Sequence, residues 1–138
     1  MTQFKPLDDR TLVAGQIYPA DLEEARRHGV TMIVNNRPDG EDEGQPSSEI
    51  LEAAAEAAGI DYRHIPIARG LGPAQIEEMR SAMSELAEDG RLLAFCRSGM
   101  RSTLAWAVAS RENGVSRDLL DERAHSAGFS LAAADHLL

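Results

Sequence analysis

The sequence predicts an α/β domain of three layers, in which a largely parallel central sheet lies between helices. Short apolar runs alternate with helix-forming segments along the chain, which is the pattern of successive strand and helix units. The runs are brief and almost wholly apolar, as expected of strands buried on both faces. At 138 residues the chain suits one core and not two. We therefore expect a single domain over residues 1–138.

The first segments follow this pattern closely. Residues 12–17 are a short apolar run, and residues 21–29 read as a capped helix that ends in glycine. Residues 31–35 contain Met, Ile and Val in succession, which predicts a buried strand. Residues 36–46 are rich in proline, glycine and acidic residues, so we expect a long surface loop there.

The rest of the chain continues the alternation. We expect a helix capped by Ser47 or Ser48 and running to residue 58, a strand at 61–67, a loop at 68–72, a helix at 73–88 and a strand at 91–95. Three more helices follow, at 103–111, at 116–127 and from residue 130 to the end. Pro73 suits the first turn of its helix, where an N–H has no partner in any case.

Three of the predicted loops leave the carboxyl ends of strands. They begin at Asn36, Ala68 and Cys96. Ligands of parallel sheets bind beyond the carboxyl ends of the strands. The sequence therefore predicts that these loops converge on one crevice.

The third loop holds the chain's one cysteine. It reads Cys96-Arg97-Ser98-Gly99-Met100-Arg101-Ser102 and leads into a predicted helix. Backbone N–H groups in a tight turn at a helix N-terminus lack helical partners, so they form a cradle for an anion. The loop residues Arg97, Ser98, Gly99, Met100 and Ser102 are thus candidates for anion binding.

Individual side chains of this loop have distinct expected roles. Gly99 permits the tight curl, and the guanidinium of Arg101 closes the cradle with a two-pronged contact to an oxyanion. Ser102 is expected to donate a hydrogen bond toward sulfur. The positive potential favours thiolate over thiol, which makes Cys96 a nucleophile at neutral pH. We interpret Cys96 and Arg101 as the catalytic pair.

A lone cysteine is more often a small apolar core residue, and that reading applies to Cys96 when it is taken alone. A core cysteine does not require the combination found here. Strand, cysteine, a stretch with serine and glycine, and then Arg-Ser at the opening of a helix together favour the functional interpretation.

Other arginines near these loops have two readings each. Arg37 follows a buried strand, where it either adds charge for an oxyanion or ties down its own acidic loop, including Glu41; we favour the second. Arg69 and Arg97 either guide an anionic donor or lie in solvent. Arg37 and Arg69, with Asp39 and Glu41, are accessory candidates rather than catalytic residues, and Arg97 stays a candidate of the anion-binding loop.

Composition excludes several function classes. The formal charge of −9 argues against a nucleic-acid or anionic-membrane surface, and it permits self-association without demanding it. A single cysteine forms no internal disulfide, no run is long enough to span a bilayer, and the N-terminus lacks a secretory core. We expect a reducing, cytoplasmic setting. The four histidines show no metal-ligand spacing and no nucleotide fingerprint is present, so we expect neither metal nor cofactor.

The motifs also carry a family resemblance. Over nearly its whole length the chain resembles the bacterial family called beta-lactamase hydrolase-like protein, phosphatase-like domain, some of whose members are labelled sulfurtransferases. The matching segments are residues 15–17, 33–41, 44–46, 64–66 and 96–102. Strand, Cys-loop-Arg and helix is also the architecture of cysteine phosphatases and of rhodaneses. The resemblance implies a fold of the dual-specificity phosphatase type.

The resemblance leaves two chemistries open. Four residues separate Cys96 from Arg101, as in many rhodaneses, whereas phosphatases of the tyrosine and dual-specificity types have five. A shorter ring suits a sulfane sulfur better than a phosphate. Such phosphatases also use an aspartic acid on a neighbouring loop as proton donor, but residues 68–72 contain no acid, and Phe95 replaces the usual histidine.

We therefore expect a rhodanese-type sulfurtransferase. Cys96 attacks a sulfane donor such as thiosulfate, sulfite leaves, and the persulfide passes its sulfur to an acceptor thiol or cyanide. The alternative is a phosphatase that works through a phosphocysteine, with Asp39, Glu41 or Asp42 as the acid if their loop folds over the site. A third hypothesis is a non-catalytic module that binds an anion or a partner, against which the intact Cys96 and Arg101 speak.

Overall fold

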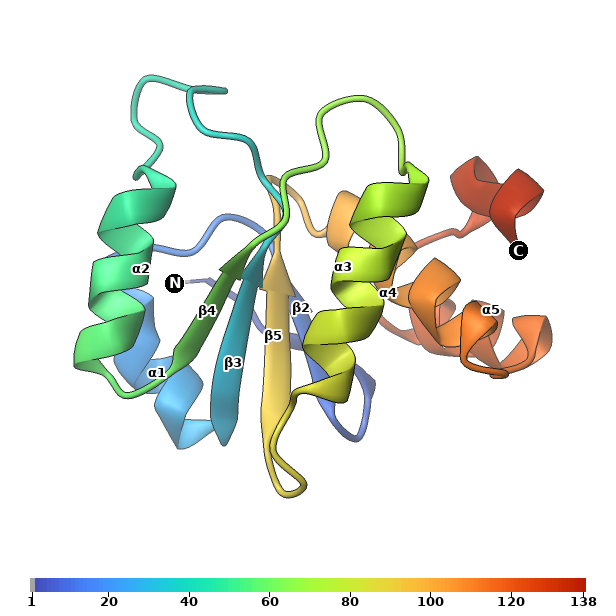
Figure 1. Cartoon of the computed structure of the whole chain (residues 1–138), viewed down its shortest axis with the longest axis horizontal. Coiled ribbons are helices and arrows are strands. Elements are labelled where there is room, and N and C mark those ends of the chain that lie inside the picture. Colours follow the sequence, from blue (N-terminus) through green and yellow to red (C-terminus); the bar gives the residue numbers. More distant parts are fainter. Residues whose placement is uncertain (1) are drawn as a thin grey trace.

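The computed structural model describes residues 2–138 and contains a five-stranded sheet with helices on both faces (Figure 1). The strands are β1 (Lys5–Asp8), β2 (Thr11–Ala14), β3 (Val30–Asn35), β4 (Asp61–His64) and β5 (Arg91–Phe95). Their order across the sheet is β1-β2-β5-β3-β4, and the last four run parallel. The predicted layered α/β fold with a mostly parallel sheet is confirmed.

Strand β5 lies at the centre of the sheet, and this position explains why its sequence is apolar after Arg91. Leu93 and Phe95 pack into a core on one face, while Leu92 and Ala94 pack into a second core on the other. All four side chains are almost wholly buried. Residues alternate between the two faces of a strand, so a central parallel strand needs apolar residues at every position.

The helices divide between the two faces (Figure 1). A short 3-10 turn, η1 (Pro19–Asp21), precedes α1 (Leu22–Arg27), and this helix and α2 (Ser48–Ala57) cover the first core. The second core lies beneath α3 (Pro73–Ser84) and α4 (Met100–Glu112). Helix α5 (Arg117–Ser126) packs beside β1, and a 3-10 segment, η2 (Ala132–Leu137), packs against α4. None of the helices within residues 2–138 is long and apolar enough to cross a membrane.

Strand β1 is an element that the sequence pattern does not reveal. It pairs antiparallel with β2 at the edge of the sheet. Only Leu7 within β1 is fully buried, and the strand contains Pro6, which an edge position tolerates. Such a short, half-exposed edge strand lacks the apolar run that identifies the central strands.

Several predicted elements differ from the structure. The strand expected at 61–67 ends at His64, and the helix expected at 103–111 begins at Met100. Helix α3 stops at Ser84 instead of continuing to residue 88. The carbonyl of Ala87 accepts hydrogen bonds from the amide of Gly90 and from the side chain of Arg10, which lies far away in sequence. The last helix is a 3-10 segment, in which Leu131 and Ala134 face the core three residues apart. Contacts with residues distant in sequence thus accompany both the early end of α3 and the 3-10 form of η2.

Candidate active site

The sulfur of Cys96 lies inside the turn between β5 and α4. It is almost wholly buried, with 1 % of the residue exposed, and it accepts a hydrogen bond of 3.1 Å from the amide of Gly99. Gly99 has a φ of 97°, in the left-handed region. This conformation turns the chain sharply enough for the Gly99 amide to face back toward the sulfur that precedes it by three residues.

Other amides of the loop remain available to a ligand. Within residues 2–138, the amides of Arg97, Ser98, Arg101 and Ser102 make no hydrogen bond to a backbone carbonyl outside the regular elements. The amide of Met100 donates to Ser98 Oγ at 3.3 Å. Unpaired N–H groups at the start of a helix of this length attract anions.

The turn after β2 contacts the Cys96 loop and holds it in place. The amide of Gln16 donates to the Arg97 carbonyl at 3.2 Å. A Cβ on Gly15 would stand 3.0 Å from that same oxygen, so a side chain there would push the loop away. Both residues belong to the segment 15–17, whose role in the site does not follow from its composition.

Arg101 faces the other loops of the site. Its Nη1 donates to Glu41 Oε2 at 2.9 Å and to the Ile67 carbonyl at 2.8 Å, and its Nη2 donates to Glu41 Oε1 at 2.9 Å. A guanidinium has five N–H donors, and these contacts use three. The two that remain, on Nε and Nη2, share one edge of the group, which suits a two-pronged contact with an oxyanion.

Cys96 and Glu41 both raise the pKa of Arg101. The pKa of the Arg101 guanidinium is raised, foremost by the hydrogen bond with Glu41 and further by the charge of Glu41 and by the neighbouring Cys96 sulfur, while partial burial opposes the shift. Arg101 therefore remains charged beside the sulfur. Segments that follow β3, β4 and β5 thus meet at Arg101, which contacts Glu41 and Ile67.

Glu41 lies between two arginines. Its Oε1 accepts from Nε of Arg37 at 2.8 Å in addition to Arg101. The Arg101 hydrogen bond, and next the Arg37 bond, lower the pKa of Glu41 from 4.5 to about 2, against the opposing effect of burial. Gln45 Oε1 accepts a hydrogen bond of 3.0 Å from the Glu41 amide, which holds the backbone of the loop at Glu41. Glu41 is consequently ionised at neutral pH.

Arg37 ties down its own loop. The residue is 3 % exposed, and besides Glu41 it contacts Gln16 Oε1 at 2.9 Å and Asp42 Oδ2 at 2.8 Å. Asp42 also lies 3.4 Å from the exposed guanidinium of Arg97. Through these contacts, Arg37 holds the acidic loop in place beside Arg101.

The acidic loop packs against Arg101, and its carboxyls at Asp39, Glu41 and Asp42 are already engaged. Asp39 accepts the amide of Ser48 at 2.8 Å at the start of α2. Glu41 and Asp42 are bound by arginines. In this arrangement each of the three carboxyls binds a partner other than Cys96.

The prediction that Ser102 donates toward the sulfur is wrong. Its hydroxyl donates to Asn36 Oδ1 at 2.7 Å, and a hydroxyl has one proton to give. Asn36 in turn donates from Nδ2 to the Ile65 carbonyl at 2.9 Å. Ser102 and Asn36 are fully buried, so this pair joins α4 to the end of β3.

Arg69 is not brought into the site. It lies exposed in the loop between β4 and α3. Three residues that the sequence reasoning did not single out do contribute: Gln16, Asn36 and Gln45. All three fall within segments quoted above for the family resemblance, which was the available signal.

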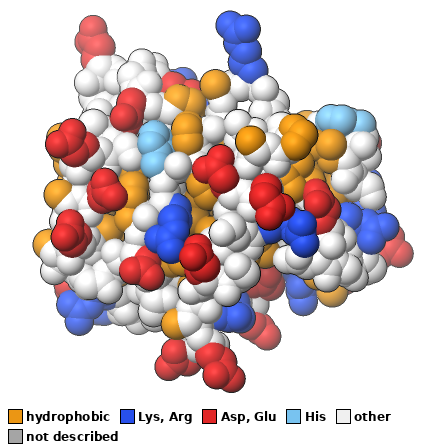
Figure 2. All heavy atoms as spheres, viewed as in Figure 1, with side chains coloured by type: hydrophobic (Ala, Val, Ile, Leu, Met, Phe, Trp, Pro, Cys, Tyr) orange, Lys and Arg blue, Asp and Glu red, His pale blue; other side chains and the backbone are white. Residues whose placement is uncertain are grey.

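Charge over the molecule does not mark the site. Figure 2 shows acidic side chains spread across the viewed face, with basic ones between them.

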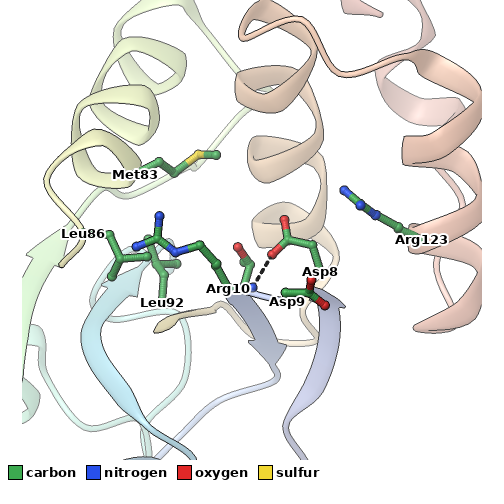
Figure 3. A pocket seen from close by; sticks show the side chains of 8 residues that line it. Asp8, Asp9, Arg10, Met83, Leu86, Leu92 and Arg123 are labelled. Carbon is green, nitrogen blue, oxygen red and sulfur yellow. Dashed lines mark hydrogen bonds between the residues drawn. The ribbon is translucent and has the colours of Figure 1, made fainter. Parts of the chain in front are cut away.

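A hollow of about 280 Å³ lies at the opposite, amino end of β5 and is lined by Asp8, Arg10 and Leu92 among others (Figure 3). Asp8 there accepts hydrogen bonds from Trp106 and from the Arg10 amide. That hollow is remote from the carboxyl ends of the strands.

Comparison with known proteins decides the family. The model of the family described as beta-lactamase hydrolase-like protein, phosphatase-like domain, matches residues 3–113. The chain belongs to this family. A beta-lactamase hydrolase-like protein of Agrobacterium fabrum is 33 % identical over 135 residues, which make up 96 % of this chain and 31 % of that protein. The chain therefore spans about a third of the length of this relative.

Solved structures of phosphatases share the fold of this chain. A candidate phosphatase from Neisseria meningitidis has a TM-score of 0.82 and 29 % identity, with 96 % of each chain covered. The active form of Tk-PTP has a TM-score of 0.73 at 21 % identity, covering 93 % of this chain and 86 % of that one, which shows the shared fold. This member of the beta-lactamase hydrolase-like family thus has the cysteine-phosphatase fold.

Proposed function

We propose that this chain is a thiolate-dependent phosphatase that acts through a phosphocysteine on Cys96. The observation that carries the proposal is the position of the Cys96 sulfur inside a turn of amide donors, beside a charged Arg101 with one edge unused. The family description and the 29 % identical candidate phosphatase support phosphate esters as substrates. The proposal replaces sulfur transfer as the first choice.

The steps follow from this geometry. The loop amides and the unused edge of Arg101 bind the phosphate oxygens, and the sulfur attacks phosphorus opposite the leaving group. The bond from phosphorus to the ester oxygen breaks, and the leaving group departs with its electron pair. Water then attacks the phosphocysteine, the bond from sulfur to phosphorus breaks, and inorganic phosphate is released.

The bound carboxyls of the acidic loop limit the substrate class. Because Asp39, Glu41 and Asp42 are engaged elsewhere, none of these three carboxyls is poised to protonate a departing alkoxide. We therefore propose substrates whose leaving groups are stable as anions, such as aryl or acyl phosphates.

The direct test is hydrolysis of p-nitrophenyl phosphate by the wild type, Cys96→Ser and Arg101→Lys. We expect no turnover with Cys96→Ser. We expect a large loss with Arg101→Lys, because lysine cannot make a two-pronged contact. Unchanged hydrolysis by Cys96→Ser would refute the proposal.

Sulfur transfer is the second candidate, and a specific observation favours it. Only four residues separate Cys96 from Arg101, which makes the loop around the sulfur smaller than one with five. Expulsion of sulfite also needs no proton donor. Cys96 would attack the sulfane sulfur of thiosulfate, the bond between the two sulfurs would break, and a thiol acceptor would later take the sulfur from the persulfide.

One comparison separates the candidates. Intact mass after incubation with thiosulfate shows the gain of one sulfur on the wild type, and not on Cys96→Ser, if sulfur transfer is the reaction. Hydrolysis of the aryl phosphate without a mass gain supports the phosphatase. If neither occurs, the chain is better explained as a binding module.

A further inference from the structure

An apolar cavity lies next to Arg101 on the side of the C-terminal segment. It measures about 230 Å³, and its walls include Ile67 and Leu71 from the loop after β4, Leu104 from α4, and Ala133 and Leu137 from η2. Of the side chains that line it, only Arg101 and His136 are polar. The cavity sits above a buried cluster formed by Ile76, Val108 and Ala134.

Arg101 belongs to this cavity and to the anion site at once. Its Nη1 is fixed to the Ile67 carbonyl, which is part of the cavity wall, and its pKa responds to the nearby Cys96 thiol. Leu104 follows Arg101 by three residues on α4 and so shares its face of the helix. A molecule whose anionic group lies on the Cys96 loop can therefore place an adjoining apolar group in the cavity.

We propose that this cavity binds the organic group of the substrate, a compact apolar moiety of one ring or a branched alkyl chain of similar size. The inference rests on the proposed function for the anionic end. An apolar cavity of about 150 Å³ in another protein accepts benzene, so the volume here suffices for one ring with a small substituent. A longer or strongly charged group does not match the volume or the lining.

Two walls of the cavity come from η2, outside the residues that the family model matches. The family model ends at residue 113, whereas Ala133 and Leu137 lie beyond it. The Cys96 loop thus provides the reaction within the part that defines the family. The C-terminal segment selects the substrate.

The test compares phenylphosphonate with methylphosphonate, neither of which needs turnover to bind. Calorimetry on the wild type should show that phenylphosphonate binds about tenfold or more tightly, because it buries a ring. Ala133→Phe fills the cavity and should abolish that preference. Ala132→Phe is the matched control, since Ala132 is also exposed on η2 but does not line the cavity. It should keep the full preference.

The outcomes separate this inference from the proposed function. Equal affinity of the wild type for the two phosphonates, or equal effects of the two alanine substitutions, overturns the cavity proposal and leaves the phosphatase proposal standing. If neither phosphonate binds, the anion site is refuted instead. Titration with toluene, followed by the methyl resonances of Leu71, Leu104 and Leu137, then tests the cavity alone; unchanged resonances would reject it.

Discussion

Glu41 holds the guanidinium of Arg101 with both carboxylate oxygens, each at 2.9 Å. The contact turns one edge of Arg101 away from substrate and leaves the edge of Nε and Nη2 free. Arg37, which is buried, holds Glu41 from the other side. We interpret Glu41 as the residue that orients Arg101, and the predictions below begin from this pair.

Glu41→Gln should lower kcat/KM by about tenfold or more, because an amide holds a guanidinium less firmly than a carboxylate does. Steady-state hydrolysis of p-nitrophenyl phosphate measures the effect. Glu43→Gln is the control, since it removes the same charge from an exposed position of the same loop. A rise in activity with Glu41→Gln would mean that Glu41 blocks the site instead of arranging it.

Stability should depend on pH through the same carboxylate. The pKa of Glu41 falls from 4.5 to about 2 on folding, chiefly because of Arg101, so ionised Glu41 stabilises the folded state above pH 4.5. That contribution is lost as the pH drops from about 4.5 toward 2. Urea denaturation should therefore show a difference between wild type and Glu41→Gln that is constant near neutrality and shrinks across this range. A constant difference at every pH would contradict the assignment.

Hydrolysis should depend steeply on the leaving group. Because Asp39, Glu41 and Asp42 are bound by other groups, the leaving oxygen receives no proton from them and departs as an anion. A series of substituted phenyl phosphates should give a strong fall in kcat/KM as the pKa of the corresponding phenol rises. A nearly flat series would reveal a proton donor that this arrangement does not show.

Ser102→Ala should affect stability more than sulfur chemistry. The substitution leaves the buried Asn36 Oδ1 without its hydrogen bond of 2.7 Å, which costs about 1–3 kcal/mol of unfolding free energy. The rate of Cys96 alkylation by iodoacetamide should change less than about twofold, since Ser102 gives its proton to Asn36. A large fall in the alkylation rate would restore the hydroxyl as a donor to sulfur.

Gly99→Ala should destabilise the protein more than Gly114→Ala. Both glycines have a φ of 97°, so both substitutions carry the cost of a left-handed alanine, about 1–2 kcal/mol. A Cβ at Gly99 would also stand 3.0 Å from Phe129 Cζ, whereas nothing lies within 4 Å of one at Gly114. Thermal denaturation of the two variants isolates the steric part, and equal losses would show that the turn has room for a side chain.

The layered fold, the central strands and the placement of the cysteine loop at a helix start follow from the sequence. Fully apolar runs such as residues 92–95 are best buried between two cores, and a cysteine that leads through glycine to arginine at a helix start has a local physical meaning. Strand β1 escaped notice because an edge strand buries too little to need such a run.

Tertiary structure alone decided the partners of each side chain. Glu41 and Arg101 are 60 residues apart, and Ser102 and Asn36 are 66 apart, so no local pattern predicts either contact. Whether a carboxylate donates a proton or orients an arginine depends on which charges the fold brings within about 3 Å of it. That choice belongs to the packed chain, because hydrogen bonds and ion pairs act at contact distance and the sequence does not state which residues will meet.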